Sequence, residues 1–304
     1  MTLQPGGSLH SYADDTQALL HCKPDAVSSE VVLLEQCIDE IGQWLAANRL
    51  KLNADKTEFL WLGTCNQLKK LTPVHPSLTV GSCTVKPADS ARLLGVLISP
   101  DLTFKQHTSS VSVSCFYQLR QIRSVRRSLD DESTATLVHA FVASRVDYCC
   151  SLLFGSPKTV TDKLQRVLNA AARVVTNTRK YDRGLHHAMR HDLHWLDMID
   201  RIQFRIAVTV YHGLHGTAPE YLSELLVPAS TRSSRHCFRS SDSNQFVVPP
   251  VKLSTYGRRV FSVSGPVVWN SLRIISETTH YPMIRSGAIS KSTFVHVINQ
   301  LTTP

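Results

Sequence analysis

The chain has 304 residues, 42% of them hydrophobic, which is enough for about two domains with sizeable cores. Its net charge is +9 and is unevenly spread. Residues 1–104 carry 8 Lys and Arg against 11 Asp and Glu, whereas residues 105–304 carry 25 against 13. A concentrated positive excess favours a nucleic-acid partner over a merely solubilising surface. No apolar run approaches the ~18 residues of a membrane span, and no basic or apolar leader opens the sequence, so we expect neither a membrane span nor a signal peptide.

Cysteine usage points to a reducing compartment. The eight cysteines stand at positions 22, 37, 65, 83, 115, 149, 150 and 237, without a Cys-x-x-Cys pair. This spacing fits neither a disulfide framework nor a zinc knuckle. We therefore expect a cytoplasmic or nuclear protein.

Residues 1–104 mix strand and helix patterns. Residues 9–12 and 17–20 are short enough to be the strands of a hairpin with residues 13–16 as its turn. Val27, Val31, Leu34, Ile38, Ile41 and Leu45 recur at spacings of four and three, which predicts an amphipathic helix ending near Asn48. Further along we expect a loop and strand over 51–62, a hairpin over 78–85 around Gly81 and Ser82, and a strand over 91–98.

From residue 105 the pattern is mainly helical. Apolar stripes predict helices around 111–122, 131–146, 164–175 and 199–213, the second with Ser128 and Asp131 as a capping box. The Ser- and Arg-rich residues 230–243 indicate a linker, and 246–251 and 260–268 could be strands. The sequence thus predicts an α+β chain divided into 1–104, 105–229 and 230–304.

The feature richest in chemistry is Tyr12-Ala13-Asp14-Asp15, which the predicted hairpin places at its tip. Adjacent carboxylates raise each other's pKa unless a cation neutralises them, and Mg²⁺ is the usual cation for such oxygen ligands. A simple polar turn is the alternative, because Asp is common in turns.

Two later segments help to interpret this hairpin. Leu50-Lys51-Leu52-Asn53-Ala54-Asp55-Lys56-Thr57-Glu58 and Leu93-Leu94-Gly95-Val96 follow it in that order. Together they resemble the later palm motifs of reverse transcriptases, most closely those of non-long-terminal-repeat retrotransposons of the chicken-repeat-one-like group. The resemblance continues through 164–173, 193–205 and 257–272. It implies a truncated polymerase palm of hairpins and a helix, then a helical thumb-like region and a small basic C-terminal region.

The resemblance also implies roles for particular residues. Asp14 matches the metal ligand of the family's hairpin and Asp15 its neighbour, with Mg²⁺ as the cofactor. Lys56 matches a lysine near the triphosphate, although a lone Lys between acidic residues could simply be solvated. Leu94, Gly95 and Val96 match the primer-grip hairpin. Ser99 stands where members commonly carry Asp, and Asp101 follows two residues later.

Arginines on the predicted helices suggest the partner. Arg120, Arg123 and Arg127 share one helical face, and Arg166 and Arg173 repeat the spacing, so they could follow a phosphate backbone. A solvated basic face is the alternative. With the resemblance, the expected partner is an RNA and DNA template–primer.

Three functions remain open. The first is a fragment of an RNA-directed DNA polymerase, inactive alone because the first catalytic Asp and the fingers are absent: eleven residues precede Tyr12 and none is acidic. The second is a non-catalytic nucleic-acid-binding remnant. The third is a helical interaction protein, which salt would distinguish, because phosphate binding weakens steeply as salt rises.

Overall fold

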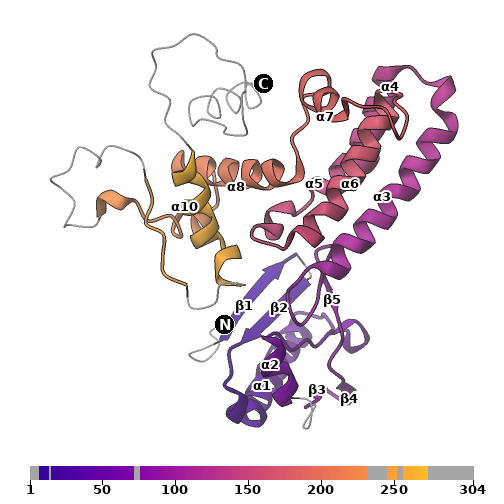
Figure 1. Cartoon of the computed structure of the whole chain (residues 1–304). Coiled ribbons are helices and arrows are strands. Elements are labelled where there is room, and N and C mark those ends of the chain that lie inside the picture. The colour runs from indigo at the N-terminus through magenta and orange to yellow at the C-terminus, as the bar shows by residue number, and fades with distance from the viewer. Residues whose placement is uncertain (1–6, 14, 72–75, 232–244, 252–255, 273–304) are drawn as a thin grey trace. The chain divides into compact units, whose positions relative to one another are not determined.

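The computed structural model describes residues 7–13, 15–71, 76–231, 245–251 and 256–272 (Figure 1). Helices are combined with short antiparallel hairpins, which confirms the α+β class. The chain divides into two compact units, residues 1–107 (the N-terminal unit) and 108–304 (the C-terminal unit). Within the described residues, none of the helices combines the length and the apolar character that crossing a membrane requires.

The N-terminal unit contains three hairpins and a long helix. In chain order its elements are β1 (Gly7–Tyr12), β2 (Asp15–Leu20), η1 (Pro24–Ala26), α1 (Val27–Ala47), η2 (Ala54–Lys56), α2 (Cys65–Leu71), β3 (Leu78–Val80), β4 (Cys83–Val85), β5 (Ala91–Leu93) and β6 (Val96–Ile98). The strands pair as β1–β2, β3–β4 and β5–β6, all antiparallel.

The first two hairpins confirm the sequence prediction, and the third corrects it. The turn of the first hairpin is shorter than expected, because Asp15 already pairs with Tyr12 as part of β2. The single strand predicted over 91–98 is wrong: the chain reverses between β5 and β6. Leu94 and Gly95 both have positive φ, 44° and 84°, as a two-residue hairpin turn requires.

The strand predicted within 51–62 is also wrong. This segment forms η2 and then an irregular extended stretch with one isolated bridge, between Phe59 and Pro87. The Ala88 N–H donates to the Phe59 carbonyl at 2.8 Å, and the Gly63 N–H donates to the Pro100 carbonyl at 3.1 Å. These two hydrogen bonds connect the segment to residues 25 or more positions later in the sequence, but they do not form a continuous strand ladder.

The core of the N-terminal unit lies between α1 and β3–β4. Val27 and Val31 are buried together with Phe59, Leu78 and Val80. Other residues of the predicted stripe pack around this cluster, among them Leu34 and Ile38, which confirms the amphipathic helix. In addition, the Glu35 carboxylate accepts the Thr79 N–H at 2.6 Å, tying α1 to β3.

Adjacent valines on α1 provide a test of this core. Val31 is 7% exposed and Val32 is 50% exposed. Val31→Asp would bury an unpaired carboxylate and should lower the free energy of unfolding by about 3 kcal/mol or more. Val32→Asp places the same group in water and should change it by less than about 0.5 kcal/mol. Urea unfolding measures both; equal midpoints would show that this face of α1 is not a core face.

The C-terminal unit is built from helices. Its elements are α3 (Lys105–Val125), which begins just before the unit boundary, η3 (Arg126–Ser128), α4 (Asp131–Val138), η4 (His139–Ala143), α5 (Ser144–Asp147), η5 (Cys150–Leu153), α6 (Lys158–Val175), α7 (Leu185–His187), η6 (Ala188–Asp192), α8 (Met198–Leu214), α9 (Glu220–Ser223), η7 (Ala229–Thr231), η10 (Gly257–Arg259) and α10 (Phe261–Ser271). The predicted helices are confirmed; the one over 131–146 contains a π-helical turn at η4.

Helix α6 is central to this unit. Half of its residues are buried, including Val167, Leu168, Ala171 and Ala172, whose side chains are completely inaccessible to solvent. Both α4 and α8 contact α6. Because its small and branched side chains pack against more than one neighbouring helix, α6 is buried on several sides rather than on a single face.

Two predictions about helical segments of this unit are corrected. The N-cap of α4 is Asp130, whose side chain accepts the Ser133 N–H at 2.7 Å, so the predicted capping box from Ser128 is wrong. The strand predicted over 260–268 is instead helix α10. Its Gly265 allows a close approach to α8, since a Cβ there would lie 3.1 Å from a methyl of Val210.

Around the predicted linker and strand, the structure is mostly irregular. Ala229–Thr231 forms η7, and residues 232–244 of the predicted linker lie outside the described residues. The segment predicted as a strand over 246–251 makes only a bridge between Phe246 and Pro228. Asn270 of α10 takes the place of a strand partner there: its side chain accepts the Phe246 N–H at 3.0 Å and donates to the Phe246 carbonyl at 2.8 Å.

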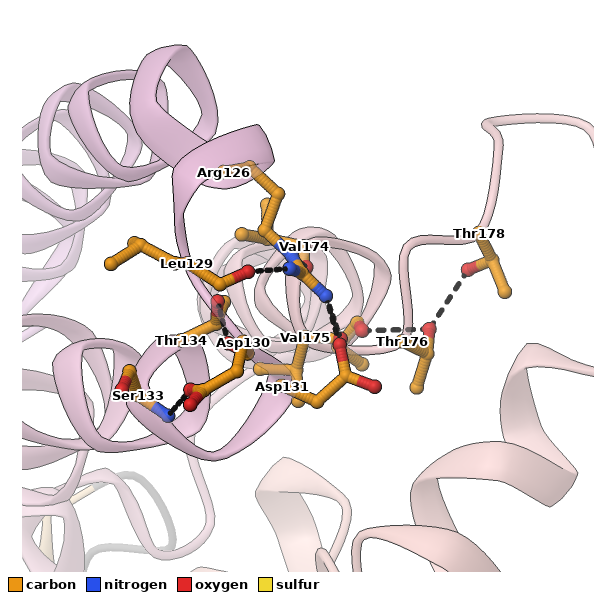
Figure 2. Close-up of polar contacts among 11 residues, drawn as sticks. Arg126, Leu129, Asp130, Asp131, Ser133, Thr134, Val174, Val175, Thr176 and Thr178 are labelled. Atoms are coloured by element: carbon orange, nitrogen blue, oxygen red, sulfur yellow. Dashed lines mark hydrogen bonds and ion pairs between the residues drawn. The ribbon is translucent and has the colours of Figure 1, made fainter.

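One arginine joins three helix ends in the C-terminal unit (Figure 2). Arg126 donates from Nε to the Val174 carbonyl at 2.9 Å and from Nη2 to the Val175 carbonyl at 3.1 Å. It also donates to the Leu129 carbonyl at 2.8 Å and forms an ion pair with Asp131. The last carbonyls of a helix lack partners within the helix and attract a cation, so the guanidinium satisfies the end of α6 while fixing the start of α4. We call this set of contacts the Arg126 clamp.

Arg126 and its neighbour Arg127 provide a matched pair for testing the clamp. The Arg126 side chain is 14% exposed, whereas Arg127 is exposed. Arg126→Gln leaves part-buried carbonyls without a charged donor and should lower the free energy of unfolding by about 2–4 kcal/mol. Arg127→Gln should change it by less than about 0.5 kcal/mol. If urea midpoints followed by helical circular dichroism are the same for both variants, the clamp does not stabilise the unit.

Candidate functional site

The carboxylate pair lies at the end of the β1–β2 hairpin. Tyr12 and Asp15 form the last cross-strand pair, and Ala13 has a φ of 54° in the turn between them. Tyr12 is 67% exposed and Asp15 is also exposed. Asp14, the expected metal ligand, lies outside the described residues. The hairpin therefore presents the aromatic ring and the Asp15 carboxylate to solvent.

The described residues do not by themselves form a metal site. Two-metal chemistry needs several carboxylates around the ions, supplied from more than one strand. In the part of the chain that the structure describes, no three His, Cys, Asp or Glu side chains come together. Asp15 is thus one potential oxygen ligand, and a Mg²⁺ site at Asp14 and Asp15 stays a prediction.

Lys56 lies in a short loop with its own hydrogen bonds. The Asn53 side chain accepts the Asp55 N–H at 3.1 Å, and the Thr57 hydroxyl donates to the Asn53 carbonyl at 3.0 Å. These contacts form the 3₁₀ turn η2 and leave the Lys56 side chain exposed. The loop can therefore present an unpaired ammonium group to a ligand.

A hydrogen bond between residues distant in the sequence connects the Lys56 loop to the β5–β6 hairpin. The Glu58 carboxylate accepts the Arg92 N–H of β5 at 3.0 Å. Two motifs that lie 34 residues apart are thereby brought into one framework. Among the described residues no hydrogen bond or ion pair joins Asp15 to Lys56, so the structure links the second and third motifs but does not bring the hairpin carboxylate into contact with the lysine.

The predicted primer-grip residues form the turn of the β5–β6 hairpin. Leu94 is 41% exposed at the tip, and Gly95 has a φ of 84°, a conformation that glycine adopts without strain. Val96 is buried and anchors the start of β6. The hairpin thus has an exposed tip on a buried base.

Asp101 stabilises the turn that follows β6. Its carboxylate accepts the hydroxyls of Ser99 at 2.6 Å and Thr103 at 3.0 Å, together with the Thr103 N–H at 3.2 Å. Burial alone would raise the pKa of Asp101, but these hydrogen bonds outweigh it and lower the pKa. The carboxylate is therefore used within its own loop and is a poor replacement for a metal ligand.

Three arginines lie near the C-terminal end of α3. Arg120 and Arg123 on α3 and Arg127 in η3, which follows it, are exposed. Within the described range none of the three forms an ion pair. The exposed aromatics Phe116 and Tyr117 precede them on the same helix. This combination of unpaired cations and aromatic rings suits a nucleic-acid surface.

The arginines of α6 and α8 divide into different environments. Arg166 is exposed, whereas Arg173 is half-buried, with Nη1 3.5 Å from the Asn169 carbonyl. Arg201 on α8 grips both oxygens of Asp147, at 2.9 and 3.0 Å. Arg201 is thus a structural ion-pair residue. Its partner lies 54 residues earlier in the sequence, which no local pattern reveals.

A half-buried histidine at the end of the N-terminal unit is hydrogen-bonded to β6. The Leu97 N–H donates to Nδ1 of His107 at 3.3 Å, which requires a neutral ring. Burial, and secondarily the charge of Arg92, lower the pKa of His107 below its ordinary 6.5. The unfolded chain therefore binds the proton more readily, so this stabilisation is complete above the unfolded pKa and is lost as the pH falls towards the folded pKa.

His107→Gln should consequently differ most from the parent at neutral pH. We expect the gap between their urea midpoints to shrink as the pH is lowered from about 7.5 to about 5, where the parent has lost the neutral-ring contribution. A gap that stays constant across this range would contradict the assignment of a neutral, hydrogen-bonded His107.

Two curated proteins of Drosophila melanogaster are similar to this chain. The "Probable RNA-directed DNA polymerase from transposon BS" is 27% identical over 185 residues, covering 58% of this chain and 19% of the fly protein. The "Probable RNA-directed DNA polymerase from transposon X-element" is 22% identical over 199 residues, covering 64% of this chain and 21% of the fly protein. The chain therefore spans about a fifth of the length of these relatives. No protein-family model matches the chain, and no solved structure matches it.

Proposed function

We propose that this chain supplies the rear part of the palm and the thumb of an RNA-directed DNA polymerase from a non-long-terminal-repeat retrotransposon, in the chicken-repeat-one-like group. In this proposal residues 1–104 are the palm portion, 105–229 the thumb-like region and 230–304 a linker with a basic C-terminal region. The order of the three motifs and the similarity to two transposon polymerases support it.

The observation that carries the proposal is the unpaired arginine face of α3. Arg126 and Arg201 on neighbouring elements are committed to carbonyls and carboxylates inside the fold. Arg120, Arg123 and Arg127 instead remain exposed and available to phosphates. Phosphate contacts position a protein along a backbone without reading its sequence, which is what a template–primer of changing sequence requires.

The palm motifs would supply the chemistry. Asp14 and Asp15 would hold Mg²⁺, which when bound activates the attacking hydroxyl and stabilises the leaving pyrophosphate. Lys56 would neutralise the triphosphate charge, and its exposed ammonium suits that role. Leu94, Gly95 and Val96 would position the growing end through the exposed tip of the β5–β6 hairpin.

We further propose that the chain alone binds a template–primer without extending it. Of the carboxylates in the palm portion, only the pair at Asp14 and Asp15 matches a metal-ligand position of the family, and one hairpin cannot surround two metal ions. Asp101, the nearest substitute in the later motifs, is held by Ser99 and Thr103. The same observation supports the second candidate function, a nucleic-acid-binding remnant with no catalysis.

Salt dependence tests the arginine face. Each phosphate contact contributes about 0.7 to 0.9 to the slope of the logarithm of the binding constant against the logarithm of salt. Replacing Arg120, Arg123 and Arg127 by Gln should therefore flatten the slope by roughly two to three units, with no change in sequence preference. Filter binding of an RNA–DNA hybrid at several salt concentrations measures it.

A control variant with the same change in net charge separates contact from bulk charge. Lys69, Lys70 and Lys86 are exposed on the N-terminal unit and outside the proposed motifs. Replacing these three by Gln should leave the slope within about half a unit of the parent. Equal slopes for all three proteins would mean that the α3 face is only solvated, and would contradict the proposal.

A further inference from the structure

The loop between α6 and α7 presents the most exposed tyrosine of the described chain. Tyr181 is 87% exposed, more than any other large apolar or aromatic side chain in the described residues. It lies in Arg179-Lys180-Tyr181-Asp182-Arg183, which carries three cations and one carboxylate. A ring that contacts so little of its own protein contributes little to folding and is available to stack on a ligand.

The loop has a defined shape in spite of its exposure. The Asp182 N–H donates to the Arg179 carbonyl at 3.2 Å, closing a turn with Lys180 and Tyr181 at its tip. The Asp182 carboxylate accepts the Arg179 N–H at 2.7 Å, so the acidic group is engaged with the backbone. The tip is thereby presented outward by its own hydrogen bonds.

The base of the loop is fixed by the Arg126 clamp. Arg126 holds the carbonyls of Val174 and Val175, and the Thr176 hydroxyl hydrogen-bonds that of Thr178 at 3.1 Å (Figure 2). Asn177, with a φ of 53°, then turns the chain out of the helix. The clamp therefore places the start of residues 177–184, which we call the 177–184 loop, beside the end of α3.

The side-chain charges of the loop are unneutralised. Within the described part of the chain, no carboxylate forms an ion pair with Arg179, Lys180 or Arg183. The ammonium of Lys180 lies over the Tyr181 ring, 5.4 Å from its centroid, and the ring is still 87% exposed to solvent. An aromatic face with flanking free cations is the pairing that stacks a base and holds its phosphates.

We propose that the 177–184 loop binds single-stranded nucleic acid, with an unpaired base stacked on Tyr181 and the flanking phosphates held by Arg179 and Arg183. A ring at the tip of a turn meets the stacked bases of a duplex only at their edges, whereas unpaired bases offer their faces. This contact goes beyond the template–primer surface of α3. It rests on the proposed function only in requiring that the chain binds nucleic acid.

Fluorescence anisotropy with the full chain tests the contact. The probes are labelled oligo(dT), oligo(U), an abasic deoxyribose-phosphate chain of the same length and a blunt DNA duplex. Tyr181→Ala should weaken binding of the single strands by about 5- to 100-fold and leave the abasic chain and the duplex unchanged. Tyr181→Phe keeps the ring and should retain the parent affinity. Tyr221→Ala, which removes a ring that is 66% exposed on α9, should have no effect.

The cations of the loop are tested separately. Replacing Arg179 and Arg183 by Gln should flatten the salt slope for oligo(dT) by about 1.4, because each single-strand phosphate contributes about 0.7. A loss with Tyr181→Ala confined to oligo(dT) would support a DNA strand as the occupant, and one confined to oligo(U) an RNA strand.

Three results would overturn the inference. The first is an equal single-strand affinity for the parent and Tyr181→Ala, and the second is an equal loss of affinity of Tyr181→Ala for the abasic chain. The third is displacement of the labelled strand by polyglutamate as effectively as by oligo(dT), which would indicate an acidic polypeptide as the ligand. The α3 variants on an RNA–DNA hybrid report on the proposed function independently. A hybrid that still binds through α3 while Tyr181→Ala has no effect would overturn this inference alone.

Discussion

The guanidinium of Arg126 is the interaction on which the arrangement of the helical unit depends. A helix that ends among other elements leaves its last carbonyls without partners, and α6, half of whose residues are buried, ends in this way. Arg126 supplies three of its hydrogen bonds to carbonyls, two of them at the end of α6, and its ion pair holds Asp131 in the first turn of α4. One planar cation thus sets the end of α3, the start of α4 and the exit of the chain from α6.

This use of Arg126 also explains why its neighbours are available for another role. The clamp and the Arg201–Asp147 pair each commit a part-buried arginine to the fold, where oxygen acceptors compensate the desolvated guanidinium. Arg120, Arg123 and Arg127 lie on the outward side and keep their donors for solvent or phosphate. Folding therefore sorts arginines of similar sequence spacing into structural and surface groups. The proposed nucleic-acid surface consists of those that folding does not use.

The sequence predicts the structure wherever the signal is local. The spacing of Val27, Val31 and Ile38 is enough to place α1, because one helical stripe meets one core. The residue pattern alone misses the reversal at Leu94, which only the resemblance to a primer-grip hairpin indicates, since leucine rarely adopts a positive φ and the flanking residues look like one strand. Helix α10 was mistaken for a strand because nearly every position of its short apolar run is buried, which removes the periodicity.

The same distinction holds for the candidate site. The hairpin ending at Tyr12 and Asp15 follows from local pattern, whereas its chemistry rests on resemblance. The link from Glu58 to Arg92, which joins the Lys56 loop to the β5–β6 hairpin, spans 34 residues and cannot be read from spacing. The contact between Arg126 and the Val174 carbonyl spans 48 residues and likewise cannot be predicted from spacing. Tertiary packing determines which side chains connect distant segments. Sequence patterns show the residue type at each position but not its contact partner.

The most direct test measures template–primer binding and primer extension in the same sample. The purified chain is incubated with a labelled DNA primer on an RNA template, deoxynucleotides and Mg²⁺ or Mn²⁺, and retention and primer length are read from the same sample. We expect the primer to be retained in a salt-sensitive complex and to keep its length, since the proposed palm portion offers one carboxylate pair for two metal ions. Extension that disappears in Asp14→Ala, or a primer that is not retained at low salt, would contradict the proposal that this chain holds a template–primer without catalysing synthesis.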